Sequence, residues 1–376
     1  MTYCAAFVTD HAIFLTADSA ATLKPGMSIH DDTFFGEQSE RDSHSILDSA
    51  LKIIPIGENR VVAVAGDFDS IVSSINFLLE HGPTIDDSVT LFTSLENSLN
   101  LRAGSVTLIC AERNNSELIL GVWSAGKDYK IPKGKNGEGP HALSIGSGRK
   151  TFGYITENVM HMVRKYPKDK LHHSLVLTST YHQLTGVHAD LGKEYIGGAF
   201  FTVAMTNNGL VWQPDITYFI YSPAAMRESR DKDEKTKSFM PVNILVRDSI
   251  AFIERRVPKY RSIIMAGAAS KAEIECVRQL HEKEVSEMSR NLACEYAIFL
   301  SRDDAYAVFL HRIKEDPYIR MVITANNLSI TYAEDFYELL IKKPKIENKQ
   351  GACLIEVVPR DLFSNDYTPP NSENAN

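Results

Sequence analysis

The chain has 376 residues and a net charge of −8, and its hydrophobic and charged fractions of 44% and 23% are typical of a globular protein. Because a nucleic-acid binder needs a basic face to neutralise phosphates, this acidic balance argues against general nucleic-acid binding. No apolar run reaches the roughly eighteen residues of a membrane span. The N-terminus also lacks the basic and apolar regions of a secretory signal, so we expect neither feature.

Two apolar runs within residues 3–17 flank a short polar turn and predict a β-hairpin. A hairpin brings its ends together, so we expect Asp18 to lie beside Thr2. Because the side chain of Thr2 is small, methionine aminopeptidase should remove Met1 and leave a free N-terminal threonine. Its α-amine, with an ordinary pKa of about 7.7–8.0, then lies next to its own hydroxyl. A threonine hydroxyl paired with a terminal amine is an activated nucleophile.

Residues 52–66 predict a second hairpin, with a turn at 57–59. Lys52 begins it, and a buried lysine paired with Asp18 would supply a positive field near the nucleophile. Gly66 ends its second strand, where a backbone N–H without a neighbouring side chain could meet a substrate carbonyl. The polar, acidic residues 23–50 before this hairpin are interpreted as a surface loop, with a lid over the site as the alternative.

The middle of the chain alternates between helical and strand patterns. Helices are predicted to residue 80 after Gly66, over 88–101, after Gly148 and over 171–184. Strands are predicted over 105–111, 117–124, a short segment ending at 145, 199–205, and from 210 after a turn at 207–209. Paired helices between runs of antiparallel strands predict an α+β fold of four layers, with two sheets inside and helices outside.

A mostly charged segment, residues 227–239, is interpreted as a linker. Beyond it, residues 240–363 predict an additional α+β unit of unknown role, and the polar tail 364–376 is expected to be disordered. Within this unit we expect helices at about 243–257, 270–292 and 333–342, and strands at 295–300, 305–313, 319–324, 328–332 and 352–358.

The five cysteines are widely spaced, which predicts reduced thiols in a reducing compartment and hence a cytoplasmic protein. Cys4 is interpreted as a small core residue rather than as a nucleophile. Gly146-Ser147-Gly148 lacks the full spacing of a phosphate-binding loop and is interpreted as a structural turn. We expect no cofactor, and we expect no metal for the following reason. The four histidines between 172 and 188 lack a completing ligand and are interpreted as surface residues, namely His172, His173, His182 and His188.

Five short motifs occur in an order that resembles proteasome β-subunits and their bacterial relatives. They are Thr2 with Ala17-Asp18-Ser19, Lys52-Ile53-x-x-Ile56, Ala65-Gly66, Ile145-Gly146-Ser147-Gly148 and Gly197-Gly198. The opening Met1-Thr2-Tyr3-Cys4 is most similar to the bacterial Anbu type. The resemblance covers roughly residues 2–225 and implies a domain at 2–226 with the four-layer αββα sandwich of N-terminal nucleophile (Ntn) hydrolases. It makes Thr2 the nucleophile, Asp18 and Lys52 its polarising pair, and Gly66 the oxyanion donor.

Three positions depart from that family. Arg149 follows the Gly-Ser-Gly turn where serine is frequent, and Lys193 and Ile196 stand where active subunits carry an aspartate and a serine. Asp190 lies nearby but is out of register by three residues. The groups that handle protons around the nucleophile therefore differ from those of active subunits.

The leading hypothesis is a threonine-type Ntn amidohydrolase, a proteasome-like peptidase acting on a peptide or another amide. Such subunits assemble around a restricted space, so we expect a homo-oligomer, with an ATP-dependent unfoldase as a candidate partner. Two alternatives stay open. One is a non-catalytic assembly or recognition protein of the same fold, which Lys193 and Ile196 favour. The other is an amidase for a small molecule.

Overall fold

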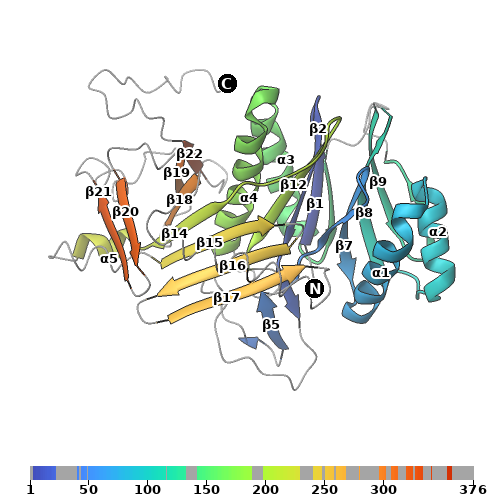
Figure 1. Cartoon of the computed structure of the whole chain (residues 1–376), viewed down its shortest axis with the longest axis horizontal. Helices are drawn as coiled ribbons and strands as arrows, with labels where there is room; N and C mark the ends of the chain where they lie inside the picture. The colour runs from blue at the N-terminus through green and yellow to red at the C-terminus, as the bar shows by residue number, and fades with distance from the viewer. Residues whose placement is uncertain are drawn as a thin grey trace.

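The structure is a computed structural model and has the predicted α+β class (Figure 1). It describes residues 3–22, 40–41, 44–48, 50–115, 117–132, 142–188, 198–228, 240–247, 250–257, 260–267, 279, 296–301, 306–311, 319–324, 327–332, 340 and 354–357.

The first sheet has five antiparallel strands and contains the predicted N-terminal hairpin. Their order is β11 (Ala142–Gly146), β1 (Tyr3–Val8), β2 (Ala12–Asp18), β12 (Phe200–Thr206) and β13 (Gly209–Trp212). The backbone N–H of Thr9 donates to the carbonyl of Ala12 at 2.9 Å and closes the turn. The register pairs Cys4 with Ala17, so Asp18 lies at the same end of the hairpin as Tyr3.

The second sheet contains the other predicted hairpin. Its order is β10 (Lys127–Lys130), β9 (Glu117–Ser124), β8 (Val106–Asn114), β7 (Arg60–Gly66) and β6 (Ile53–Ile56). Side chains alternate between two cores along its strands. Ala63 and Ile109 face the first sheet, whereas Val62 and Leu108 face helices.

Each of these two five-stranded sheets carries a pair of helices on its outer face (Figure 1). The second sheet is covered by α1 (Phe68–His81) and α2 (Ser88–Leu99), which share a core with its outer residues. The first sheet is covered by α3 (Arg149–Val163) and α4 (Leu171–His188). A short 3-10 turn at Gly82–Thr84 follows α1, and another at Lys168–Lys170 precedes α4. The order of layers is therefore helices, sheet, sheet, helices.

A seven-stranded sheet is assembled from strands before and after the charged segment. Its order is β17 (Tyr260–Gly267), β16 (Ile250–Val257), β15 (Met240–Arg247), β14 (Ile216–Tyr221), β18 (Tyr296–Ser301), β19 (Tyr306–His311) and β22 (Leu354–Val357). Pairing is antiparallel except between β14 and β18 and between β19 and β22.

The remaining elements are small. They are helix α5 (Pro223–Glu228), the hairpin of β20 (Ile319–Thr324) with β21 (Asn327–Tyr332), and a sheet of β3 (Ala20–Thr22), β5 (His44–Asp48) and β4 (Glu40–Arg41). Along the parts of the chain that the structure describes, no helix is both long and apolar enough to cross a membrane.

The predicted helix at about 243–257 is wrong, because these residues belong to β15 and β16. Val242, Ile244 and Val246 alternate along β15 and pack into the main core, and such β-branched residues fit a pleated strand better than a helix. The strands predicted near 296, 306, 319, 327 and 354 are present. The helices predicted at 270–292 and 333–342 and the tail at 364–376 lie outside the described residues, apart from Gln279 and Leu340. Of the linker predicted at 227–239, residues 227–228 end helix α5, and the rest lies outside the described residues.

Helix α4 lies between two sheets. Leu175 and Tyr181 pack with the first sheet, whereas Val176 and Leu184 belong to the core that includes the seven-stranded sheet. The Thr180 hydroxyl lies 3.4 Å from the hydroxyl of Tyr218 on β14. The seven-stranded sheet therefore forms a further layer over α4.

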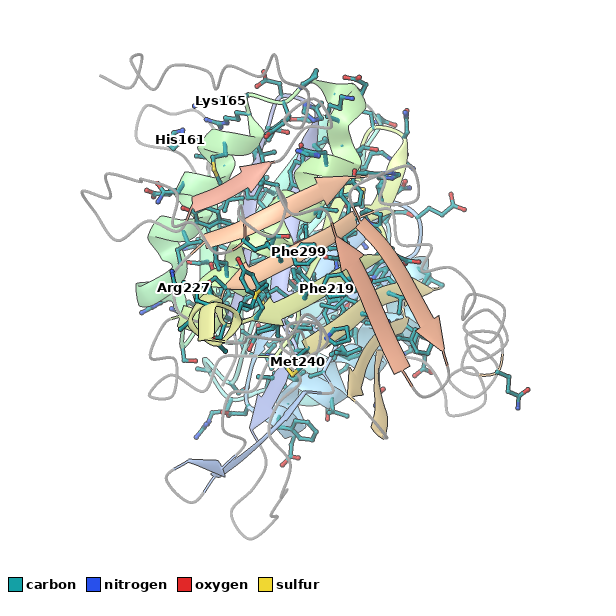
Figure 2. All side chains as sticks on the ribbon, turned by 90° about the vertical axis from the view of Figure 1, so that its left-hand side faces the viewer. His161, Lys165, Phe219, Arg227, Met240 and Phe299 are labelled. Atoms are coloured by element: carbon teal, nitrogen blue, oxygen red, sulfur yellow. The ribbon has the colours of Figure 1, made fainter. Side chains whose placement is uncertain are left out.

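The opposite face of that sheet carries a stacked aromatic pair. Phe219 on β14 and Phe299 on β18 are register partners, with ring centroids 4.9 Å apart (Figure 2). Their neighbours Tyr218 and Ile298 point toward α4 and join the main core.

Burial of α4 corrects the interpretation of its histidines as surface residues. His182 is fully buried, His173 is half-buried, and His172 is exposed as expected. The side chain of His188 lies outside the described part.

Candidate active site

A buried ion pair joins the two hairpins. The Lys52 ammonium lies 2.6 Å from Asp18 Oδ1, and the two side chains are 6% and 0% exposed. Lys52 Nζ also donates to the carbonyl of Ala20 at 2.5 Å. A buried ion pair needs such additional hydrogen bonds to offset the cost of leaving water. The predicted meeting of Asp18 and Lys52 is therefore present.

The first residue of β1 is hydrogen-bonded to the same carboxylate. The backbone N–H of Tyr3 donates to Asp18 Oδ1 at 2.9 Å, so one oxygen accepts from both Tyr3 and Lys52. Thr2 and Met1 lie outside the described residues. Since the Tyr3 nitrogen is bonded directly to the carbonyl carbon of Thr2, the ion pair is one peptide unit away from that residue.

Gly66 ends β7 on the same side of the hairpin as Lys52. The backbone N–H of Val64 donates to the Lys52 carbonyl at 2.9 Å, two residues before Gly66. Gly66 has a φ of +152° and is exposed. A Cβ at this position would lie 2.1 Å from the carbonyl oxygen of Ser105. Only glycine fits here without distorting the backbone.

Two further sequence motifs converge on the start of β1. Tyr3 pairs with Gly146, which places the Gly-Ser-Gly turn beside it. The Ser19 hydroxyl accepts from the backbone N–H of Ala199 at 2.8 Å, which places the residue after Gly198 next to Asp18. Segments far apart in the sequence therefore meet at one end of the first sheet. Asp190, Lys193 and Ile196 lie outside the described residues.

Cys4 is a core residue, as expected. Its thiol is fully buried and donates to the carbonyl of Val64 at 3.3 Å. Burial raises the pKa of the Cys4 thiol far above its usual value, although the neighbouring Lys52 opposes this effect. A thiol that stays protonated is a poor nucleophile.

Sequence reasoning missed a polar chain beneath the site. The Tyr3 hydroxyl lies 2.7 Å from Thr156 Oγ1, which lies 3.5 Å from His182 Nε2. His182 Nδ1 is 2.8 Å from the carbonyl of Thr178. Burial lowers the pKa of His182 to about 4, so this imidazole is neutral near pH 7. The available signal was Thr156, which lies on a face of α3 with Val159 and Met160. His182 carries no such signal, because Thr178 and Ser179 lie on its own face of α4.

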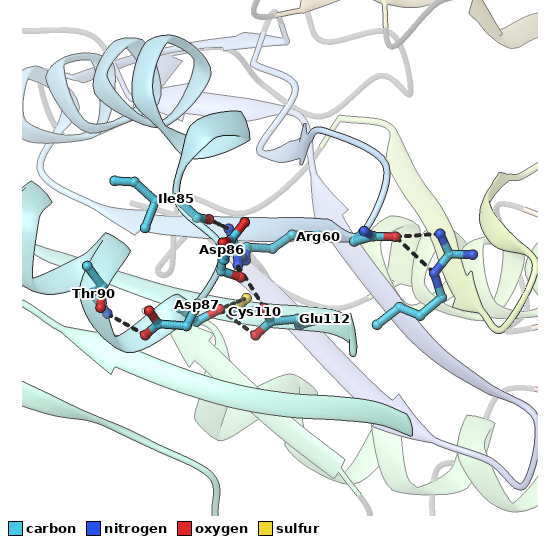
Figure 3. Close-up of polar contacts among 10 residues, drawn as sticks. Arg60, Ile85, Asp86, Asp87, Thr90, Cys110 and Glu112 are labelled. Carbon is cyan, nitrogen blue, oxygen red and sulfur yellow. Dashed lines mark hydrogen bonds and ion pairs between the residues drawn. The ribbon is translucent and has the colours of Figure 1, made fainter. Parts of the chain in front are cut away.

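A second, partly buried ion pair lies at the other end of β7 (Figure 3). Arg60 Nη2 is 2.7 Å from Glu112 Oε1, and the guanidinium also donates to the carbonyls of Ile85 and Asp86. Because Arg60 begins the strand that Gly66 ends, about 20 Å separate this cluster from the candidate site. Its contacts hold the segment before α2 against the second sheet.

No group of three or more His, Cys, Asp and Glu side chains within the described ranges could hold a metal ion.

The chain combines a layered α+β architecture with a buried ion pair beside the start of β1. No protein-family model matches the sequence, and no curated protein matches it. Among solved structures, the chain is similar to Anbu (ancestral beta-subunit) from Yersinia bercovieri, with 15% identity and a TM-score of 0.36. The match covers 56% of this chain and 82% of that one.

Proposed function

We propose that the chain is a threonine-type Ntn amidohydrolase of peptidase character, with Thr2 as its nucleophile after removal of Met1. One observation carries this proposal. The Asp18 carboxylate accepts from the Lys52 ammonium at 2.6 Å and from the Tyr3 backbone at 2.9 Å, in a buried environment. A fixed charge pair one residue from a terminal threonine suits the activation of its hydroxyl.

The packing of two sheets between two helix pairs supports assignment to the αββα sandwich of Ntn hydrolases. We propose that residues 2–226 form this sandwich and also supply β14 to the seven-stranded sheet, whose other strands come from residues 240–363, with 227–239 as a linker. Homo-oligomeric assembly, an unfoldase partner and a cytoplasmic location are parts of the same proposal. The free, buried thiols of Cys4 and Cys110 fit a reducing compartment.

In the proposed reaction the Thr2 hydroxyl attacks an amide carbonyl, and the Thr2 α-amine accepts the hydroxyl proton. The backbone N–H of Gly66 donates to the oxyanion of the tetrahedral intermediate. Collapse of the intermediate breaks the C–N bond, and the α-ammonium returns its proton to the departing amine. Water, deprotonated by the α-amine, then hydrolyses the threonine ester. The Lys52 ammonium favours each negatively charged oxygen on this path.

Intact-mass measurement of untagged protein, with and without a β-lactone or epoxyketone, tests this proposal. We expect loss of Met1 and a single adduct, located on Thr2 by peptide sequencing. Thr2→Ala should abolish the adduct, whereas Thr84→Ala, which alters an exposed threonine on a short 3-10 turn, should leave it unchanged. Retention of Met1, or an adduct that persists in Thr2→Ala, would contradict the proposal.

A non-catalytic assembly or recognition protein is the second candidate, because Lys193 and Ile196 replace the acid and the serine of active family members. It predicts retained Met1 and no adduct in the same measurement. A small-molecule amidase would form the adduct but would cleave short acyl amides in preference to peptides.

A further inference from the structure

The Tyr3 hydroxyl begins a buried hydrogen-bond chain that runs from β1 through α3 to α4. It contacts Thr156 Oγ1 at 2.7 Å, and Thr156 contacts His182 Nε2 at 3.5 Å. All three residues are at most 1% exposed. The link between Thr156 and His182 is the longest and hence the weakest of the chain.

The acceptor at the end of this chain, the Thr178 carbonyl, fixes the tautomer of His182. A backbone carbonyl only accepts, so His182 Nδ1 must carry the hydrogen in its 2.8 Å contact with Thr178. In the neutral imidazole, Nε2 is then an acceptor. This tautomer suits a chain in which the Tyr3 hydroxyl donates to Thr156 and the Thr156 hydroxyl donates to His182. The pKa of His182, lowered by burial to about 4, keeps this order intact near pH 7.

Tyr3 is consequently held at both ends. Its backbone N–H is fixed on Asp18 at 2.9 Å, and its hydroxyl is fixed in the helix layer. Its ring lies between these anchors, with centroids 5.8 Å from His182 and 6.4 Å from Phe200. Chain termini fray unless tertiary contacts hold them.

We propose that Tyr3, Thr156 and His182 are positioning residues that hold the Tyr3 backbone on Asp18 and so set the place of the residue before it. The consequence for catalysis rests on the function proposed above, whereas the consequence for the Tyr3 backbone does not. Misplacement of a reacting group by about 1 Å costs about a hundredfold in rate, so a residue beside the nucleophile benefits from a second anchor.

Hydrogen exchange at the Tyr3 amide, followed by NMR on protein labelled with ¹⁵N-tyrosine, tests whether the three residues hold the Tyr3 backbone. Thr156→Val should accelerate this exchange by about tenfold, the equivalent of one lost hydrogen bond, and Thr156→Ser should restore it. The matched control is Thr217→Val, which removes a buried threonine hydroxyl bonded to Asn243 at 2.8 Å on the seven-stranded sheet. Equal effects of the two valine variants, or no effect of Thr156→Val, would overturn the inference.

If Thr156→Val does not fold, Tyr3→Phe removes the hydroxyl and retains the ring, and exchange is followed by mass spectrometry of the N-terminal peptide. We expect faster exchange of that peptide than in the parent protein. Unchanged exchange would contradict the role of the Tyr3 hydroxyl.

The rate of Thr2 modification by a β-lactone tests whether the three residues also position the nucleophile. It should fall by at least about tenfold in Thr156→Val and stay unchanged in Thr217→Val. Equal rates in the two variants would show that the three residues do not position the nucleophile. If the parent protein itself is never modified, the proposed function fails, while the exchange of the Tyr3 amide still decides whether the three residues hold the backbone.

Discussion

At the scale of single residues, Asp18 is a buried charge whose stability depends on its hydrogen-bond partners. Its carboxylate is fully buried and accepts hydrogen bonds from a charged and a neutral donor. Removing one member of a buried ion pair leaves an uncompensated charge, which costs more than the pair contributes.

We predict that Lys52→Met destabilises the protein by about 3–5 kcal/mol. Asp18→Asn with Lys52→Met should cost less than the sum of the two single variants, because neither charge then stays buried alone. Urea unfolding measures each value. As a control, Arg102→Met removes an exposed pair with Asp67 and should cost at most about 1 kcal/mol. Equal losses for Lys52→Met and Arg102→Met would contradict this account.

The sequence was sufficient to predict the pair of Asp18 and Lys52 only through the resemblance to proteasome β-subunits, because hairpin geometry places Asp18 beside the start of the first strand but does not bring the second hairpin to it. It was insufficient for the contact of Tyr3 with Thr156, since these residues are separated by 153 positions and their meeting depends on how α3 crosses the first sheet. Long-range packing of this kind leaves no periodic signal in either segment.

At the scale of elements, α4 shows the effect of burial from two sides. Residues 174–184 are all buried between the first sheet and the seven-stranded sheet. Some of its polar side chains bond within the helix, as where the Thr178 hydroxyl donates to the Ser174 carbonyl at 2.7 Å, whereas Gln183 bonds to Gly198 and Phe200 outside it. The sequence predicted the helix but not its surroundings, because a helix covered on both faces has no amphipathic stripe.

Burial of His182 on this helix predicts a pH dependence of stability. The folded-state pKa of about 4 lies below the ordinary value of 6.5. The unfolded chain therefore binds the proton more tightly between these values, and stability falls as pH decreases from 6.5 toward 4. The contribution of His182 to this loss should be about 3 kcal/mol.

Urea unfolding at several pH values measures the loss. His182→Gln should flatten the dependence relative to the parent protein, while His172→Gln, which alters an exposed histidine of the same helix, should not. Identical pH profiles for the parent protein and His182→Gln would refute the assignment.

Most strands were predictable from apolar alternation and turn residues. The segment 243–257 was not, because an apolar run flanked by charges satisfies both helical and strand patterns. The segment 240–247 forms a strand because it pairs with residues 216–220 of the buried strand β14.

At the scale of the whole molecule, one core connects the three large sheets. It includes Ala63 of the second sheet, Phe201 of the first, and Ile298 of the seven-stranded sheet. The parallel pairing of β14 with β18 joins residues 80 positions apart, from Ile216 to Tyr296. Sequence patterns carry no information about such a pairing.

This continuity predicts cooperative unfolding. Ile298→Ala should destabilise the protein by about 2–5 kcal/mol, because the site is fully buried. The fluorescence of the two tryptophans, Trp123 and Trp212, reports on the two five-stranded sheets. Its transition in urea should shift together with far-UV circular dichroism. A tryptophan transition that stays at its original midpoint would contradict a shared core.

The most direct test of the central claim is the rate at which a β-lactone modifies Thr2 in the parent protein and in Lys52→Met, with folding checked by circular dichroism. The account predicts modification of Thr2 in the parent protein and a loss of about a hundredfold or more in folded Lys52→Met, because the field that favours the hydroxyl anion is gone. Equal modification rates in the two proteins, or no modification of Thr2 in the parent protein, would contradict it.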